Sequence, residues 1–295
     1  IEDASSYLFS LNHSQPYSYE GYTCGYLRYH YPVEFLTCAL NINKDNEDKT
    51  IALTAYARKQ GIKISSVRFR HSVFNYSCDP TERIIYKGLA SIKFMNEAVS
   101  QELYNLRDNK YDNFIDLLKN IEQTSCNSRQ LEILLKLGFF EEFGEINQLL
   151  KIVEIYNFFK KGEAKQLSKN KIPEWLPEYL LKKHCTETEK QYKILNCVIL
   201  LKEVLEAVQY PKTTLLDILE YEQEYLGYIQ TTIDIGNQYY YISDIKEAML
   251  TLYQLKTGDT LKIKCRKKTQ KQDPIESGMI IKVENGSMVF KSLAL

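Results

Sequence analysis

Apolar residues recur every three to four positions over most of the chain, which is the spacing of helices that bury one face. The segment "TIALTAYARKQGIKI" (50–64) follows this pattern and contains Gly61, a residue type that commonly closes a helix. Pro32 fits the first turn of an earlier helix, because its missing N–H costs nothing there. The same spacing predicts short helices between residues 91 and 143, and longer ones over 144–161, 174–184, 188–209 and 212–229.

Two parts of the chain instead alternate apolar and polar residues, which is the period of a β-strand. Residues 62–77 and 83–89 are rich in β-formers and are joined by the turn sequence "SCDPTE". Near the C-terminus, residues 249–268 alternate about a Lys-Thr-Gly-Asp turn, and residues 277–293 alternate about an Asn-Gly turn, a strong hairpin signal. These patterns predict a mainly α protein with a small C-terminal antiparallel β domain, α+β overall.

Composition narrows the class of protein. The 295 residues are 44% hydrophobic and 26% charged, so the chain can bury a core, and the formal net charge is zero. A compact DNA-binding module is usually basic, so the neutral balance counts against a free-standing one. Seven cysteines at wide spacing, with no CxxC pair, argue against a disulfide framework and a zinc site. With neither a leader peptide nor a long apolar run in view, we expect a cytoplasmic location.

The sequence carries no recognisable catalytic motif. It lacks GxGxxG, GxxxxGK[ST], HExxH and GxSxG, and no D-x-D pair stands in an apolar strand setting. An independent enzyme that uses His13 and His30 as acid and base would need an acidic or nucleophilic partner, and none is visible nearby. We therefore expect no catalytic residues in this chain.

Basic residues are concentrated in "KIKCRKKTQK" (262–271), which holds six Lys or Arg and no acid. On a strand, alternate positions share a face, so a row of cations could follow a phosphate backbone. The equally weighted alternative is an edge strand whose charges prevent aggregation. "RFRH" (68–71) and Arg58-Lys59 form a second, weaker cluster. The row that shares one face is Lys262, Lys264, Arg266 and Lys268.

Residues 10–32 hold six tyrosines and two of the four histidines. Together with the following residues they resemble the fingers region of the C-family bacterial replicative DNA polymerases, the DNA polymerase III α subunits. That family has a Ser-His, a later Tyr and an "LK-x-HYP-x-EF" segment, whereas its preceding Asn-Lys is replaced here by Ser10 and Leu11. The matching positions are His13, Tyr17, Tyr22, Leu27, Arg28, His30, Tyr31, Pro32, Glu34 and Phe35.

The resemblance continues in family order along the chain. "KGLASIKFMNEAV" (87–99) resembles the family's "GLGAIKGVG" element, and "NSRQLEILLKLGFFEEFG" (127–144) resembles its "NRRVLEALIKAGAFD" helix. "DILEYEQEYLGYI" (217–229) resembles the segment that leads into the OB domain. The resemblance implies fingers with a β-hairpin over 1–86, a tandem helix-hairpin-helix over 87–145, a helical connector over 146–230 and an OB-like β domain over 231–295.

The resemblance also implies roles for particular residues. The fingers residues Asn12, His13, Tyr17, Tyr22 and Arg28 would face the incoming nucleotide or template, since imidazole and tyrosine groups can bond phosphate oxygens and stack on bases. For Tyr26 and Tyr31 we expect packing against other helices instead. The first hairpin, Phe94-Met95-Asn96, has no glycine, so we expect Asn96 to supply a left-handed turn. Backbone-phosphate contacts would come from Lys93, Asn96, Ser128 and Arg129. The alternative role of Asn96 is a helix cap, as it is for Asn127, which precedes Ser128.

The family's metal-binding aspartates lie in a palm domain that would precede residue 1. Mg²⁺ is therefore expected only with that palm, and the palm-bearing part or chain is an expected partner, together with primer–template duplex and other replication proteins. The expected function is non-specific grip of duplex DNA and positioning of the nucleotide. The alternative is a non-catalytic adaptor that docks another replication protein through residues 144–230; the zero net charge favours it.

Overall fold

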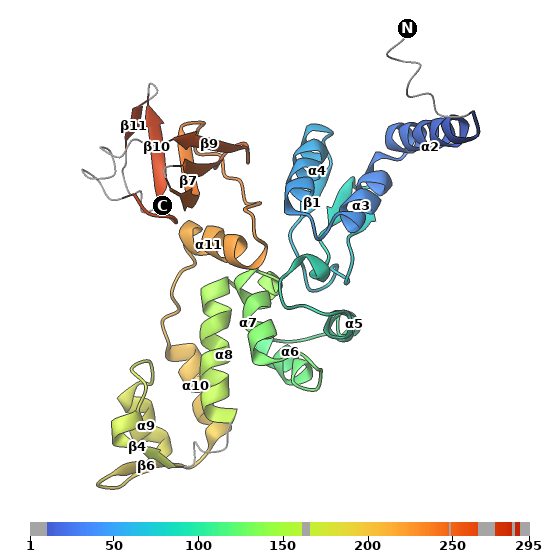
Figure 1. Cartoon of the computed structure of the whole chain (residues 1–295). Coiled ribbons are helices and arrows are strands. Elements are labelled where there is room, and N and C mark those ends of the chain that lie inside the picture. Colours follow the sequence, from blue (N-terminus) through green and yellow to red (C-terminus); the bar gives the residue numbers. More distant parts are fainter. Residues whose placement is uncertain (1–10, 161–165, 248, 265–274, 285–286, 290–295) are drawn as a thin grey trace.

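The computed structural model describes residues 11–160, 166–247, 249–264, 275–284 and 287–289 (Figure 1). Figure 1 shows an elongated, branched molecule: the N-terminal helices and the C-terminal sheet lie at one end, and a helical lobe extends to the other. Helices dominate and the C-terminal sheet is antiparallel, so the predicted α+β class is confirmed.

The N-terminal region packs two helices against a small sheet. Its core is a cluster around Val33, Leu36, Leu40 and Ile85. Pro32 occupies the first turn of α3 and Gly61 has a φ of 66° after α4, so both predicted boundaries are correct. The elements are α2 (Leu11–His30), α3 (Pro32–Ile42), α4 (Glu47–Lys59), β1 (Lys63–Ser65), β2 (Ser77–Asp79) and β3 (Ile84–Tyr86).

The sheet of this region differs from the expected hairpin. Strands β2 and β3 do pair in antiparallel fashion around the predicted turn, with Cys78 opposite Ile85. Strand β1 joins the other edge of β3 in parallel, so the order is β1-β3-β2. Alternation along residues 62–77 could not show this, because parallel pairing joins segments about 20 residues apart.

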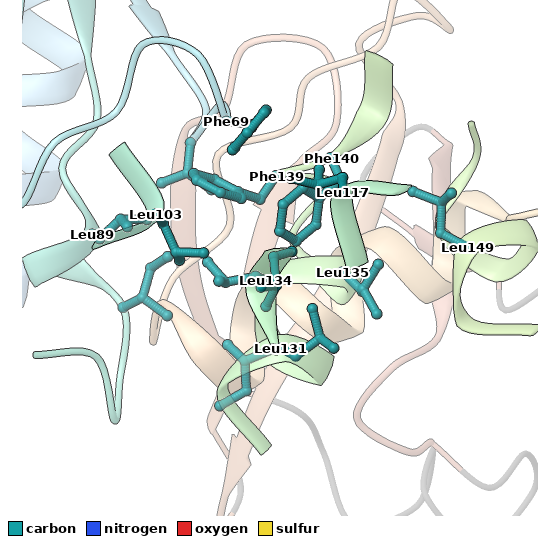
Figure 2. Packing of buried hydrophobic residues seen from close by; sticks show 14 of the residues in the cluster. Phe69, Leu89, Leu103, Leu117, Leu131, Leu134, Leu135, Phe139, Phe140 and Leu149 are labelled. Carbon is teal, nitrogen blue, oxygen red and sulfur yellow. The ribbon is translucent and has the colours of Figure 1, made fainter. Parts of the chain in front are cut away.

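The middle of the chain is built on the largest hydrophobic cluster (Figure 2). Figure 2 shows Phe69, Phe139 and Phe140 gathered at one side of the cluster, with Leu134 and Leu135 of the central helix beside them. Phe69 comes from the N-terminal region, so this core joins the two regions of the chain. The elements are η1 (Leu89–Ser91), α5 (Glu97–Asn105), α6 (Phe114–Ile121), α7 (Ser128–Lys136), η2 (Glu141–Phe143) and α8 (Ile146–Lys160).

A separate lobe forms at the far end of α8. Its buried residues include Ile155, Leu181, Leu200 and Val204. The expectation of one helix over 188–209 is wrong: residues 191–194 form the middle strand of a three-stranded sheet, and the helix begins only at Cys197. The elements are β4 (Gln166–Ser168), η4 (Lys169–Lys171), α9 (Glu178–His184), β5 (Cys185–Glu187), β6 (Gln191–Ile194) and α10 (Cys197–Ala207).

Helix α11 (Leu215–Tyr225) leads into a five-stranded antiparallel sheet of order β11-β10-β7-β8-β9. Both predicted hairpins are present as β8–β9 and β10–β11. The first strand, β7, was not predicted; it carries an irregularity between Ile242 and Asp244 that bends its pairing with β8. The strands are β7 (Tyr239–Lys246), β8 (Met249–Gln254), β9 (Thr260–Lys264), β10 (Ile280–Glu284) and β11 (Ser287–Val289).

A buried polar network fixes the sheet's connecting segment against the N-terminal region. The Glu222 carboxylate accepts hydrogen bonds from the N–H groups of Gln230 and Thr231, at 2.9 and 3.0 Å. The fully buried Lys87 donates to Gln230 Oε1 at 2.8 Å, and Arg58 donates to the Gln230 carbonyl at 2.8 Å. Across the described ranges, no helix combines the length and apolar character needed to cross a bilayer.

Candidate nucleic-acid interface

The first hairpin turns at Phe94 rather than at Asn96. Phe94 has a φ of 70°, in the left-handed region that favours glycine, and holding a bulky residue there costs on the order of 1–2 kcal/mol. Asn96 has an extended backbone, and its side chain caps α5 by accepting from the Val99 N–H at 2.9 Å. The expectation of a left-handed Asn96 is therefore wrong, because the chain uses this residue as the helix cap.

The start of α7 holds this turn in place. The Gln130 side chain donates to the Phe94 carbonyl at 3.0 Å. The Arg129 guanidinium lies 3.7 Å from the centre of the Phe94 ring, a cation–π contact on a ring that is 55% exposed. The tertiary fold thus places Arg129 directly beside the hairpin, although 35 residues of sequence separate it from Phe94.

Lys93 lies on the same turn and is held by the end of α11. Its N–H donates to the Tyr225 carbonyl at 3.2 Å, and its Nζ donates to the Glu224 carbonyl at 2.8 Å. Lys93 and Arg129 are both exposed, and neither forms an ion pair with a carboxylate among the described residues. Two uncompensated cations therefore flank the Phe94 turn.

The first turn of α7 adds hydrogen-bond donors at the same place. Asn127 and Gln130 form a reciprocal capping box, and α7 has no acidic residue in its first turn. Within the described part of the chain, no hydrogen bond uses the N–H of Ser128 or Arg129. Such free N–H groups and the positive end of the helix dipole suit an anion. We call Lys93, Phe94, Ser128 and Arg129 the hairpin site.

The second hairpin, between α6 and α7, is closed by a carboxylate. Glu102 on α5 accepts from both the N–H and the hydroxyl of Ser125, at 2.6 and 2.7 Å. These hydrogen bonds hold the pKa of Glu102 below its usual value. Burial, with a smaller contribution from Glu102, raises the pKa of the neighbouring Cys126 thiol to about 11. This hairpin presents a carboxylate and a protonated thiol, so it suits a phosphate less than the first.

Helix α2 presents the tyrosine-rich stretch to solvent. Tyr17 and Tyr22 are 69% and 73% exposed, as a surface that contacts a ligand requires. The expectation that Tyr26 and Tyr31 pack into a core is wrong: they are 46% and 49% exposed. The Tyr26 ring instead lies 4.3 Å from that of His30, one turn along the same helix. Within the described residues, Tyr22, Tyr26 and Tyr29 make their ring contacts with other residues of α2.

The remaining fingers residues are placed differently. Arg28 does not point away from the protein: its Nε donates to the Tyr56 hydroxyl at 3.0 Å, and its guanidinium stacks 4.4 Å from that ring. These contacts tie α2 to α4. Asn12 and His13 lie in the first turn of α2, and their side chains are outside the described structure.

The C-terminal lysine row is only partly described. Lys262 and Lys264 are exposed on β9, an edge strand. Ile263, on the other face of the same strand, packs toward the core. Arg266 and Lys268 fall outside the described residues. The geometry suits both readings of this row, the phosphate contact and the protected edge. Figure 1 shows α2, the α5–α7 hairpins and β9 in separate places, so the predicted contact residues form three groups rather than one.

Sequence reasoning missed Phe94 as a member of the hairpin site. The glycine-free turn was the available signal, since some residue of a turn of this kind must accept positive φ. For a catalytic metal, the side chains do not fit: within the described ranges, no cluster of three or more His, Cys, Asp or Glu could hold a metal ion.

Comparison with known proteins bears on the same region. Residues 61–149 match the family model described as a helix-hairpin-helix motif. The chain is 29% identical over 148 residues to a DNA polymerase III subunit alpha of Saccharopolyspora erythraea, covering 50% of this chain and 12% of that protein. It is 29% identical over 156 residues to that of Thermus aquaticus, covering 52% of this chain and 13% of that one.

A third relative, the DNA polymerase III subunit alpha of Campylobacter jejuni, is 31% identical over 144 residues, which are 48% of this chain and 12% of that protein. These matches, together with the helix-hairpin-helix motif, confirm the resemblance read from the sequence. The chain is therefore similar, over about half of its length, to a part of the DNA polymerase III α subunits, and it contains a helix-hairpin-helix motif.

Proposed function

We propose that this chain grips primer–template duplex through the hairpin site, without reading sequence, and positions the incoming nucleotide or template base through α2. The observation that carries the proposal is the convergence at Phe94 of two uncompensated cations and two free N–H groups, from Lys93 and the start of α7. Charge-assisted contacts from such groups suit phosphate oxygens.

The chemistry of the site favours the DNA backbone over base edges. Lysine, arginine and main-chain N–H groups at a helix start bind phosphate oxygens and carry no sequence information. Each neutralised phosphate releases counterions, so affinity should fall steeply as salt rises, with a log–log slope of about −0.9 per contact.

Helix α2 supplies the second part of the proposal. Its exposed Tyr17 and Tyr22 offer ring faces for stacking on bases and hydroxyls for phosphate oxygens. Asn12 and His13 are proposed to act at the start of the same helix. Arg28 would serve mainly to hold α2 in position, because Tyr56 already occupies its guanidinium.

Catalysis would need a palm-bearing part or chain as partner. Nucleotidyl transfer in such polymerases uses two metal ions held by carboxylates, and Mg²⁺ would enter with that palm. The proposed setting is the cytoplasm, where the duplex and other replication proteins are at hand.

The test is the binding of a fluorescent primer–template duplex, measured by anisotropy over a salt series. We expect saturable low-salt binding that Lys93→Glu or Arg129→Glu weakens at least about tenfold, with a salt slope reduced by about one or two. The matched control is Lys190→Glu, an exposed charge reversal in the α9–α10 lobe, which should leave affinity unchanged. Equal affinity in all three variants would contradict the role of the hairpin site.

A second candidate function is a protein-docking adaptor. The observation that favours it is an apolar patch at the start of α10, where Leu195, Val198 and Ile199 are 69%, 77% and 48% exposed. Patches of this kind often mark protein interfaces. No duplex binding at low salt by a folded wild-type chain, with a replication protein bound in a manner that Val198→Glu abolishes, would favour the adaptor over the DNA grip.

A further inference from the structure

A pocket of about 210 Å³ lies where α4 and β1 meet the segment between α11 and the C-terminal sheet. Its walls carry three cations, Arg58, Lys63 and Arg68, and the hydroxyl-bearing residues Thr54 and Ser66. It is smaller than the pockets that enclose whole drug-sized ligands, of roughly 300–1,000 Å³. It therefore suits one small charged group of a ligand, while the rest of that ligand stays outside the pocket. The pocket is separate from the hairpin site, with which it shares no lining residue.

The three cations of the pocket differ in whether a carboxylate already neutralises their charge. Arg68 is paired with Glu141. Arg58 donates to neutral groups, the carbonyl of Gln230 at 2.8 Å, the carbonyl of Thr257 at 3.3 Å and the Tyr253 hydroxyl, and it forms no ion pair within the described ranges. Lys63 is exposed, and its Nζ has neither a hydrogen bond nor an ion pair within the described ranges. Two positive charges of the pocket thus lack a counter-charge.

Two hydroxyl groups of the pocket, those of Thr54 and Ser66, are also available. No hydrogen bond among the described residues uses the hydroxyls of Thr54 or Ser66. A hydroxyl can donate to an anionic oxygen by rotating about its own bond. The donors at the pocket are thus of the types that bind phosphate oxygens: guanidinium, ammonium and hydroxyl.

The far wall of the pocket is rigid before any ligand arrives. Gln230 is held by Lys87 through its side chain and by Arg58 through its carbonyl. Thr231 donates its hydroxyl to Glu222 at 2.7 Å. The buried Glu222 carboxylate accepts three hydrogen bonds from this segment, and the positive charge of Lys87 is close enough to interact with it. The Glu222 carboxylate behind this wall is therefore already engaged inside the protein.

We propose that this pocket binds a single phosphate group, belonging either to a nucleic-acid strand or to a free nucleotide, between Lys63 and Arg58. The choice of these two sources rests on the proposed function, whereas the affinity of the pocket for phosphate does not. Of the sequence cluster Arg58-Lys59, only Arg58 lines this pocket. The second cation is Lys63, and Lys59 lies outside the pocket.

The first experiment uses inorganic phosphate as the probe, followed by phosphorus-31 NMR line width on the full chain in a chloride buffer. We expect saturable broadening for wild type that Lys63→Gln weakens about fivefold and Lys63→Glu abolishes, as for loss of one partly exposed cation. Lys59→Gln removes the same charge from the end of α4, outside the pocket, and should bind as wild type does. Equal broadening in wild type, Lys63→Gln and Lys63→Glu would overturn the proposal.

The second experiment identifies the source of the phosphate by competition. Displacement of inorganic phosphate by a single-stranded oligothymidylate without terminal phosphates assigns the site to a strand. Displacement by dATP alone assigns it to a nucleotide, and displacement by neither overturns the proposal. Arg129→Glu should leave the Lys63-dependent phosphate binding intact, so failure of the duplex grip and failure of this pocket give different results.

Discussion

Replacing Lys87 by methionine probes the buried network that joins the N-terminal region to the C-terminal sheet. Lys87 is 1% exposed; its Nζ donates to Gln230 Oε1 at 2.8 Å and lies 4.4 Å from the centre of the Tyr228 ring. Methionine keeps most of the side-chain volume but removes the charge and the donor. The change therefore isolates the polar contribution from that of packing.

Two opposing effects set the size of the change in unfolding free energy. A hydrogen bond to a charged group contributes about 1.5–3 kcal/mol, and a buried charge left without its partner costs about 3–5 kcal/mol. In this protein the group that loses its hydrogen-bond donor is Gln230 Oε1, and Glu222, which is 4% exposed and keeps its hydrogen bonds from Gln230 and Thr231, loses a nearby positive charge. Methionine also removes the cost of burying the ammonium, which offsets part of the loss. We expect a net destabilisation of about 3 kcal/mol.

The assay is urea unfolding followed by circular dichroism, with the midpoint compared at constant slope. The control is Lys49→Met, an exposed lysine of α4, which should change stability by less than about 0.5 kcal/mol. A double-mutant cycle with Glu222→Gln should show a coupling of about 1–3 kcal/mol, because the charges of Lys87 and Glu222 interact in the buried network. A Lys87→Met variant as stable as wild type, with no coupling, would refute the reasoning.

The pH dependence gives an independent check of the same residue. Burial lowers the pKa of Lys87 below its ordinary value, partly opposed by Tyr76 and Glu222. The unfolded chain then binds more protons than the folded one just below the ordinary lysine pKa, so this group makes stability rise with pH there. Burial raises the pKa of Tyr76, so above about pH 10 that residue acts in the opposite direction. The rise should appear for wild type as the pH approaches the ordinary lysine pKa from below, and it should be absent in Lys87→Met.

Three further changes test other parts of the structure. Gly258→Ala should destabilise the protein by about 1–3 kcal/mol in the same urea assay, because φ is +75° and the added Cβ would clash with the Arg58 guanidinium. Gly21→Ala, in open space on α2, should instead stabilise that helix by up to about 1 kcal/mol; a lower helical signal would contradict its exposure. Burial raises the pKa of Asp217, but hydrogen bonds, chiefly from Thr214, hold this pKa below its usual value. The contribution of Asp217 to stability is therefore present above about pH 4 and lost in more acid solution. Asp217→Ala should therefore lose about 1 kcal/mol at neutral pH and show a shallower acid unfolding curve, and an unchanged curve would exclude this role.

The sequence by itself determined the features that depend on neighbouring residues. The start of α3 at Pro32, the left-handed Gly61 after α4 and the capping role of Asn127 could all be read locally. So could the β8–β9 turn at Gly258, because turn and cap residues act within a few positions of themselves. The resemblance to the polymerase family likewise rests on ordered local motifs, and these motifs are enough to locate the hairpin.

Only the tertiary structure decided which distant residues meet. Arg129 reaches Phe94 because α7 packs beside the hairpin, and Lys87 is buried because Gln230, 143 positions away, supplies its acceptor. The short strands β4 and β6 exist through mutual pairing, and too few residues lie in each for a periodic signal. The energies of these contacts come from pairing and desolvation across the fold, and no window of neighbouring residues contains them.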